Sequence, residues 1–161
     1  MRVLSFDPGY ERLGIAVLEE DKKPRVIHSE CFKTNKELPQ PERLGLVSEK
    51  IKKLITEFKP DIISLEKLFF QKNQKTALKV AEVRGIILSL ASVYRSEILE
   101  FSPQEIKIAV TGYGNADKAS VMKMVPILVS GLKKTESDDE IDAVAIGITS
   151  LLSTSFHRKI S

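Results

Sequence analysis

Two short stretches of the sequence, residues 3–7 and 62–66, follow the same order of residue classes. Each has two aliphatic residues, a serine, a large apolar residue and a carboxylate, so each predicts a buried strand that ends in an acid. If the strands are parallel neighbours, Asp7 and Glu66 emerge together at one edge of the sheet, where open α/β sheets place their sites. Asp7 begins an Asp-Pro-Gly sequence that would also make an ordinary turn, and the second acid is what favours a functional site.

The rest of the pattern predicts how these two strands become neighbours. Residues 13–18 and 25–34 read as two further strands that form an antiparallel meander with the first. Residues 41–58 have apolar positions at helical spacing and would cross over to the strand at 62–66, which can then return parallel. A helix at 74–95, a strand at 97–101 and helices from Pro103 onward follow. We therefore expect an α/β fold with a five-stranded mixed sheet flanked by helices.

Composition limits the class of protein. With 161 residues, of which 42% are hydrophobic, the chain can bury one full core, so we expect a single domain over residues 1–161. No apolar run approaches the roughly 18 residues that a membrane span needs, and the stretch after Met1 is too short for a signal peptide, so we expect a cytoplasmic protein. Cys31 is the only cysteine and is interpreted as a buried spectator. The net charge of +3 permits a nucleic-acid partner without requiring one.

Two helical segments carry further expectations. The helix at 74–95 has too many apolar residues for one buried stripe, so it should be covered on more than one side, by a central position or by a subunit interface. Pro126 should kink or end a helix at 122–129 near its middle.

A second group of acids precedes the last apolar run. Ser137 and Glu140 have the spacing of a capping box, so a helix should begin here, and acids in its first turn are ordinary. Asp142 lies between apolar residues, where a charge must be paired or bind a metal ion. Asp139, one turn back, can act with it, and Asp138, four residues back, is a competing partner.

Four carboxylates from three segments would repel one another in a shared site, and divalent metal would relieve that repulsion. Mg²⁺ prefers oxygen ligands, and two such ions can clamp the attacking and leaving oxygens of a phosphodiester. The acids therefore favour hydrolysis of a nucleic-acid backbone.

The chain resembles the ribonuclease H-like nucleases, and specifically the RuvC family of Holliday junction resolvases. The resemblance runs nearly end to end and is carried by the Asp7 turn with Gly14, by Glu66 with the segment that follows it, and by residues 77–79, 84–85, 112–118 and 139–142. It implies a homodimer that makes paired nicks in four-way DNA junctions with preference for a short T-rich sequence, using Mg²⁺ or Mn²⁺, and a branch-migration complex of the RuvA–RuvB type as a partner. It further implies that the catalytic, metal-binding carboxylates are Asp7, Glu66, Asp139 and Asp142.

Other positions matching the family include two lysines and an aromatic. Lys118 follows a glycine turn and begins a helix, so it is the better supported of the two lysines that could neutralise charge near a scissile phosphate, whereas Lys107 depends on the resemblance. Phe69 is expected to stack on a junction base, while Phe70 is as readily interpreted as core. The complete set of expected DNA contacts is Phe69, Phe70, Lys72, Asn73, Lys75 and Lys79.

Three alternatives stay open at this point. The chain could be an inactive ribonuclease H-like module that holds branched DNA, an actin-like phosphate-binding protein, or a member of the related resolvase-like family with RNA-processing roles. The intact acids argue against the first, the length of 161 residues argues against the two lobes that the second needs, and the Asp139/Asp142 spacing argues against the third. His28 and His157 are interpreted as spectators.

Overall fold

A five-stranded sheet forms the middle layer of the molecule. The computed structural model describes residues 1–161 except for 10, 68–73, 135–136 and 161, and it describes no side chains for residues 74–75 and 156–160. The strand order is β3-β2-β1-β4-β5. Their bounds are Arg2–Pro8 for β1, Arg12–Glu19 for β2, Arg25–Lys33 for β3, Ile62–Glu66 for β4 and Glu97–Phe101 for β5. The first three strands are antiparallel neighbours, whereas β4 is parallel to both β1 and β5, which confirms the expected mixed sheet.

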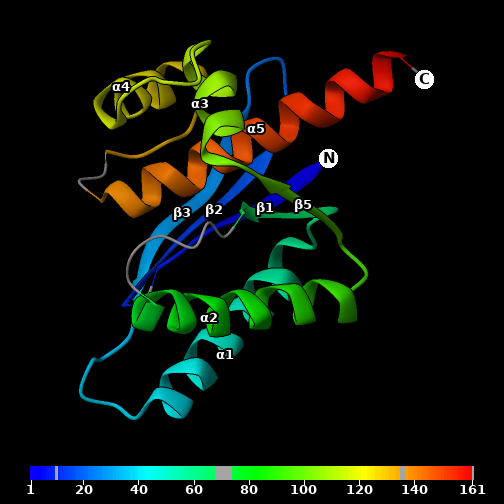
Figure 1. The fold of residues 1–161 in the computed structure, drawn as a ribbon. Helices are drawn as coiled ribbons and strands as arrows, with labels where there is room; N and C mark the ends of the chain where they lie inside the picture. Colours follow the sequence, from blue (N-terminus) through cyan, green and yellow to red (C-terminus); the bar gives the residue numbers. More distant parts are fainter. Residues whose placement is uncertain (10, 68–73, 135–136, 161) are drawn as a thin grey trace.

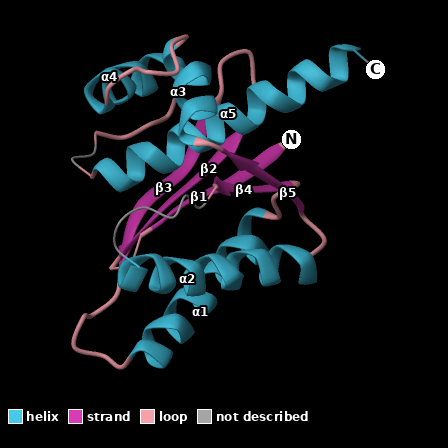
Figure 2. Cartoon of the chain, in the orientation of Figure 1, coloured by secondary structure: helices cyan, strands magenta, loops and turns pink. Residues whose placement is uncertain are grey.

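Helices cover both faces of this sheet (Figure 1). Figure 2 shows helices both below and above the strands. The lower pair is α1 (Gln40–Phe58) and α2 (Gln74–Val93), and the upper group is α3 (Pro103–Thr111), α4 (Lys118–Leu128) and α5 (Asp138–Ile160). Each face has its own apolar core, with Leu4 and Phe6 of β1 in the lower core and Val3 in the upper one. Alternate residues of the central strand therefore contribute to opposite cores.

The upper face of β1 lies close against α5. The fully buried Ser5 hydroxyl donates a hydrogen bond of 2.7 Å to the Ala143 carbonyl oxygen. A Cβ added at Gly147 would lie 2.4 Å from Leu18 Cδ1 and 2.9 Å from Ser5 Oγ, so only glycine permits this approach. This packing brings the start of α5 to the edge of the sheet where β1 ends.

The structure differs from the expectation for the helix that contains Pro126. That helix, α4, begins at Lys118, where the Asp117 side chain accepts a hydrogen bond from the Ser120 N–H, and it continues to Leu128. Pro126 therefore lies in the last turn and does not end the helix near its middle.

The apolar helix α2 packs on one side only, within the described part of the chain. Its Val83, Ile87, Leu90 and Ala91 join the lower core, whereas Leu78 on its outer side is 65% exposed. The central position considered from the sequence is therefore wrong for the described chain.

None of the helices in the described residues has the length and apolar character that a membrane span requires.

Candidate active site

Asp7 and Glu66 leave the sheet side by side. The β1–β4 register pairs Ser5 with Ser64 and Phe6 with Leu65, so the next residues of the two parallel strands are the two acids. The predicted pairing of the repeated strand ends is therefore confirmed. A turn follows β1 and is closed by a 3.0 Å hydrogen bond from the Gly9 N–H to the Arg12 carbonyl. Asp7 therefore both precedes a turn and lies beside a second acid.

Gly14 lets the N-terminal end of α5 approach this edge. Gly14 lies opposite Asp7 in the β1–β2 ladder. A Cβ built on it would lie 2.0 Å from the Asp139 carbonyl oxygen and 3.1 Å from Asp7 Cβ. Any side chain at this position would push α5 away, because the nearest atoms are backbone. The third segment of acids thus reaches Asp7 because β2 carries a glycine here.

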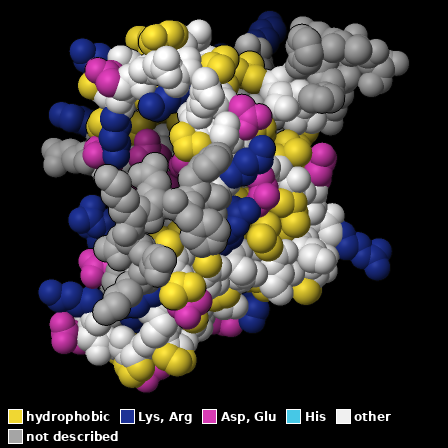
Figure 3. Space-filling view, viewed as in Figure 1, with side chains coloured by type: hydrophobic (Ala, Val, Ile, Leu, Met, Phe, Trp, Pro, Cys, Tyr) yellow, Lys and Arg dark blue, Asp and Glu magenta, His cyan; other side chains and the backbone are white. Residues whose placement is uncertain are grey.

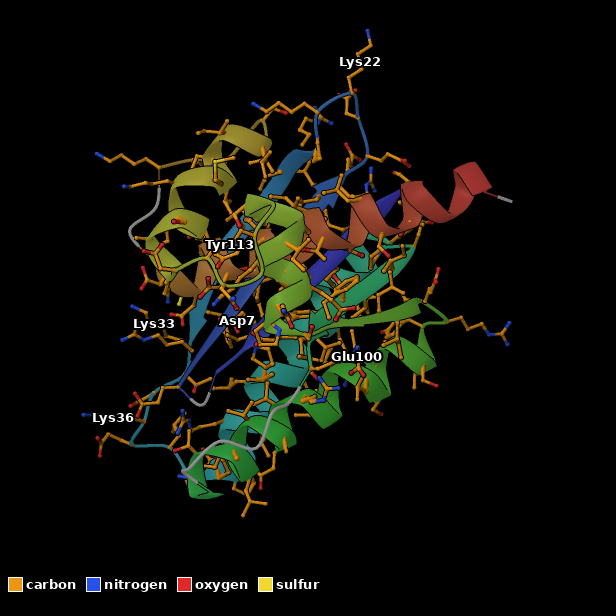
Figure 4. The ribbon with its side chains drawn as sticks, turned by 45° about the horizontal axis from the view of Figure 1, so that its top comes forward. Asp7, Lys22, Lys33, Lys36, Glu100 and Tyr113 are labelled. Carbon is orange, nitrogen blue, oxygen red and sulfur yellow. The ribbon has the colours of Figure 1, made fainter. Side chains whose placement is uncertain are left out.

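A cavity of about 200 Å³ opens beside these acids. It contains four of the residues expected to be catalytic, two acids and two lysines, together with an apolar wall. The charged residues are Glu66, Lys107, Lys118 and Asp142, and the apolar ones are Pro103, Ile106, Val121 and Ile146. The sheet, α3, α4 and α5 each contribute to it. In Figure 4, Asp7 lies near the centre of the molecule, below the loop that carries Tyr113.

The acids raise one another's pKa. Burial, followed by the charges of Asp142, Glu66 and Asp139, raises the pKa of Asp7 to about 7, and only Lys118 acts in the opposite direction. Burial and the Asp142 charge also raise the pKa of Glu66, while Lys107 lowers it. The pKa of Asp142 is raised by burial as well. These carboxylates therefore lie close enough to oppose ionisation of their neighbours.

Lys118 bridges two acids on consecutive turns of α5. Its Nζ lies 3.1 Å from Asp138 Oδ2 and 3.3 Å from Asp142 Oδ2. The lysine is placed by the start of α4 and by the preceding loop, in which Gly112 adopts a φ of 79° that favours glycine. The structure thus groups Asp142 with Asp138 around the ammonium, and the competing partner noted in the sequence does lie beside it.

Asp139 points to a different neighbourhood. Its Oδ2 lies 3.5 Å from Arg12 Nη1 and accepts a long contact of 3.6 Å from Cys31 Sγ. Cys31 is only partly buried, so the expected buried position is wrong, and its thiol touches a candidate site acid. Ser29 and Cys31 lie two residues apart on β3 and therefore point to the same face, and Ser29 donates a hydrogen bond to Glu140 of α5. This period of two was the signal in the sequence that could have placed Cys31 against α5.

Arg84 supports the end of β4, a role that was not recognised in the sequence. Its Nη1 donates a 2.8 Å hydrogen bond to the Glu66 carbonyl oxygen, and its Nη2 pairs with Glu100 of β5. Arg84 is largely buried, and burial lowers its pKa. Because the guanidinium binds the backbone of Glu66, it fixes where that acid leaves the strand.

The donor set of this site suits a hard divalent cation. Asp7, Glu66, Asp139 and Asp142 supply oxygen ligands alone. The raised pKa values of Asp7, Glu66 and Asp142 come from burial and from nearby negative charges, and a divalent cation would relieve that repulsion. Within the described residues, no three carboxylate, histidine or cysteine side chains already converge as a metal-holding group. The side chains of Asp139 and Asp142 instead face Arg12 and Lys118.

Most of the expected DNA contacts fall where the structure gives no side chains. Phe69, Phe70, Lys72 and Asn73 lie outside the described residues, as does the side chain of Lys75. Lys79 is partly buried on α2.

Comparison with known proteins identifies the family. The model for the family described as crossover junction endodeoxyribonuclease RuvC matches residues 3–150. A curated relative of that name from Thermosipho melanesiensis is 39% identical over 97% of this chain and 100% of its own length. Another from Alkaliphilus metalliredigens is 36% identical over 92% of this chain and 91% of its own length.

Solved structures give the same answer. The Thermus thermophilus RuvC structure has a TM-score of 0.87 at 28% identity and covers 97% of both chains. The T. thermophilus protein in complex with Holliday junction substrate has a TM-score of 0.90 at 29% identity, covering 98% of this chain and 96% of that one. The expected ribonuclease H-like fold is thereby confirmed. The chain belongs to the crossover junction endodeoxyribonuclease RuvC family.

Proposed function

We propose that this chain is a metal-dependent endonuclease that resolves four-way DNA junctions by paired nicks during recombination and repair. The observation that carries the proposal is the acidic edge of the β1–β4 pair, where Asp7 and Glu66 adjoin a cavity that also contains Asp142, Lys107 and Lys118. Family membership and the likeness to a relative solved with a Holliday junction support the substrate. Residues 1–161 would act as one nuclease domain.

Asp7, Glu66, Asp139 and Asp142 would hold Mg²⁺ or Mn²⁺, with two ions in each site. When bound, these ions stabilise negative charge on phosphate oxygens and favour a nucleophilic water. The oxygen donors of all four acids and the raised pKa values of Asp7, Glu66 and Asp142 support this assignment.

The two lysines would act on the phosphate. Lys107 and Lys118 enter the same cavity from α3 and α4, so their ammonium groups flank the space in which a phosphate would lie. A fixed cation beside a reacting phosphate stabilises the charge that develops in the transition state, and removing such a donor typically lowers the rate by about 10²–10³-fold.

DNA would bind across the face that contains this cavity. Figure 3 shows Lys and Arg side chains at several places on one face of the molecule, interspersed with acidic side chains. Such basic residues can hold phosphates of the arms and leave the acids of the cavity for catalysis. Phe69, Phe70, Lys72, Asn73, Lys75 and Lys79 remain the proposed contacts with DNA.

The active form would be a homodimer, because two symmetric cuts need two sites. Leu78 and Val93 of α2 are 65% and 71% exposed, and Gly85 lies on the exposed side between them. A Cβ at Gly85 would meet no described atom within 4 Å, although glycine inside a helix costs about 1 kcal/mol relative to alanine. A second copy of α2 packed close to Gly85 would account for it. In light scattering, the Gly85→Leu protein should then have the molar mass of one chain and the wild type the molar mass of two chains.

A branch-migration complex of the RuvA–RuvB type is the proposed partner at the junction, on the basis of the family alone. The direct test of the function is incubation of end-labelled DNA with the purified protein and Mg²⁺ or Mn²⁺. A four-way junction should be cut at symmetric positions, and linear duplex and structured RNA should not. Asp7→Asn should bind the junction and leave it intact; normal cleavage by this variant would refute the site.

A further inference from the structure

Lys118 has a second acid available to it outside the cavity. Asp138 and Asp142 lie one turn apart on α5, and each places Oδ2 within 3.3 Å of the Lys118 ammonium. The two acids differ in their surroundings. Asp142 is the more buried and lines the cavity, whereas Asp138 is half-exposed and lies outside it. The ammonium thus lies between Asp142, which lines the cavity, and Asp138, which lies outside it.

Asp142 pairs with Lys118 and is also one of the proposed metal ligands. It raises the pKa of both Asp7 and Glu66, so it lies among the carboxylates that would hold a metal ion. A cation held there and the Lys118 ammonium would compete for the same carboxylate oxygen. Lysine carries its charge on a flexible stem, so an ammonium that lost its only partner would turn into solvent.

The neighbouring acid does not take over this role. The Asp139 side chain instead contacts Arg12 and Cys31. Among the described acids of the first turn of α5, Asp138 is the one at salt-bridge distance from Lys118. Its position at a helix start would also be favourable without any lysine, so the test has to separate these two roles.

We propose that Asp138 is a positioning residue that keeps the Lys118 ammonium at the mouth of the cavity when Asp142 binds a metal ion. The inference rests on the proposed nuclease function and adds to it a residue specific to Lys118. Asp138 touches neither the phosphate nor the metal in this scheme.

The first test observes Lys118 directly and needs no DNA. In protein labelled with ¹⁵N-lysine, an ammonium held by a carboxylate gives a protected side-chain signal, which Lys118→Ala assigns by its loss. The signal should survive saturating Mg²⁺ in the wild type and in Asp138→Glu, and it should vanish on Mg²⁺ addition in Asp138→Asn. Survival in Asp138→Asn, or loss from the wild type, would overturn the inference.

The second test is a double-mutant cycle on single-turnover junction cleavage. Asp138→Asn should slow cleavage about tenfold when Lys118 is present and by less than about twofold in the Lys118→Ala background, because the acid acts through the lysine. Asp138→Glu should restore most of the rate, and junction affinity should not change. Equal losses in both backgrounds would show a helix-start effect and contradict the proposal. A wild-type protein that cuts no junction would refute the proposed function, and the ammonium signal would still decide the role of Asp138.

Discussion

The acids at the two ends of the central strand β1 have pKa values that are shifted in opposite directions. At its start, Glu19 of β2 accepts hydrogen bonds from Arg2 and Arg25 at 2.7 and 2.6 Å, and Asp61 accepts one from the Arg2 backbone N–H at 2.7 Å. Arg25 and Arg2 lower the pKa of Glu19. At the other end of the strand, the pKa of Asp7 rises to about 7 in the company of three further acids.

This difference separates structural acids from functional ones. Glu19 is neutralised by cations of the same chain, so its charge is balanced in the folded protein alone. Asp7, Glu66 and Asp142 oppose one another's ionisation, and a folded chain keeps such a group when an external ligand relieves it. The same fold thus holds both a charged group that is balanced within the sheet and a cluster of acids that forms the proposed metal site.

The largest effect should come from removing an acid at the functional end. Glu66→Gln keeps the shape of the side chain and removes a charge from the cavity, so the cleavage rate should fall about 10²–10³-fold while junction binding persists. Single-turnover cleavage measures this. The matched change at the other end, Glu19→Gln, should cut at the wild-type rate. Equal losses for the two variants would remove the distinction between the ends.

The second prediction concerns pH and the metal-free protein. The pKa of Asp7 rises from 3.8 to about 7 on folding, so the folded state holds this proton more tightly than the unfolded state does. Stability should therefore fall as the pH rises from 4 to 7, by up to about 4 kcal/mol for such a shift. Urea unfolding in a chelator at pH 5 and pH 8 measures it.

Asp7→Asn provides the control for this pH dependence. It should be more stable than the wild type at pH 8 and should lose less stability between pH 5 and pH 8. Mg²⁺ should stabilise the wild type at pH 8, because an ion that binds the folded state alone shifts the equilibrium toward it. A wild type whose stability increases over this range would contradict the assigned repulsion.

The third prediction tests the approach of α5 to the functional end. Gly14→Ala places a Cβ against the Asp139 carbonyl, so it should lower the free energy of unfolding by about 1–3 kcal/mol and reduce cleavage. Gly45→Ala is the matched control, because a Cβ at this exposed position in α1 meets no described atom within 4 Å. That change should be neutral or stabilising in the same unfolding experiment.

The smallest effect should be found at the balanced end. Glu19→Gln removes two partly exposed ion pairs, with Arg2 and Arg25. Ion pairs of this kind are typically worth about 0–1 kcal/mol each at neutral pH. Because the pKa of Glu19 is lowered on folding, this contribution exists above its unfolded value of 4.5 and is lost as the pH falls through the folded value. The difference in Tm between the variant and the wild type should therefore shrink in acid. A difference that grows in acid would contradict the assigned pairs.

The sequence predicted the fold because local pattern and connection rules agree in this chain. The repeated strand endings, the meander and the crossover helix α1 all fit one sheet, and β1 and β4 do lie parallel. Pro126 was misjudged because apolar spacing alone placed its helix at 122–129, whereas the helix begins at Lys118, where the Asp117 side chain caps it.

The site could be predicted in part. Asp7 and Glu66 follow from strand order, and Asp142 from an acid in an apolar run, since both arguments use periodicity. The role of Arg84 could not be seen, because it depends on which side chain of α2 meets the end of β4, whereas the contact of Cys31 with α5 was open to the same argument from strand periodicity. Likewise, Lys118 joins Asp138 with Asp142 through the packing of α4 on α5, which no spacing along the chain encodes.

The contribution of α5 to the site has a consequence for synthesis of the protein. Asp139 and Asp142 lie on α5, the last helix described. That helix reaches Asp7 by packing closely on β1 and β2, which is possible because Gly14 and Gly147 carry no side chain. A nascent chain that has released the sheet and α1 to α4 from the ribosome would still lack two of its four acids. The proposed nuclease would therefore stay inactive toward nearby nucleic acid until α5 has been synthesised and has docked on the sheet.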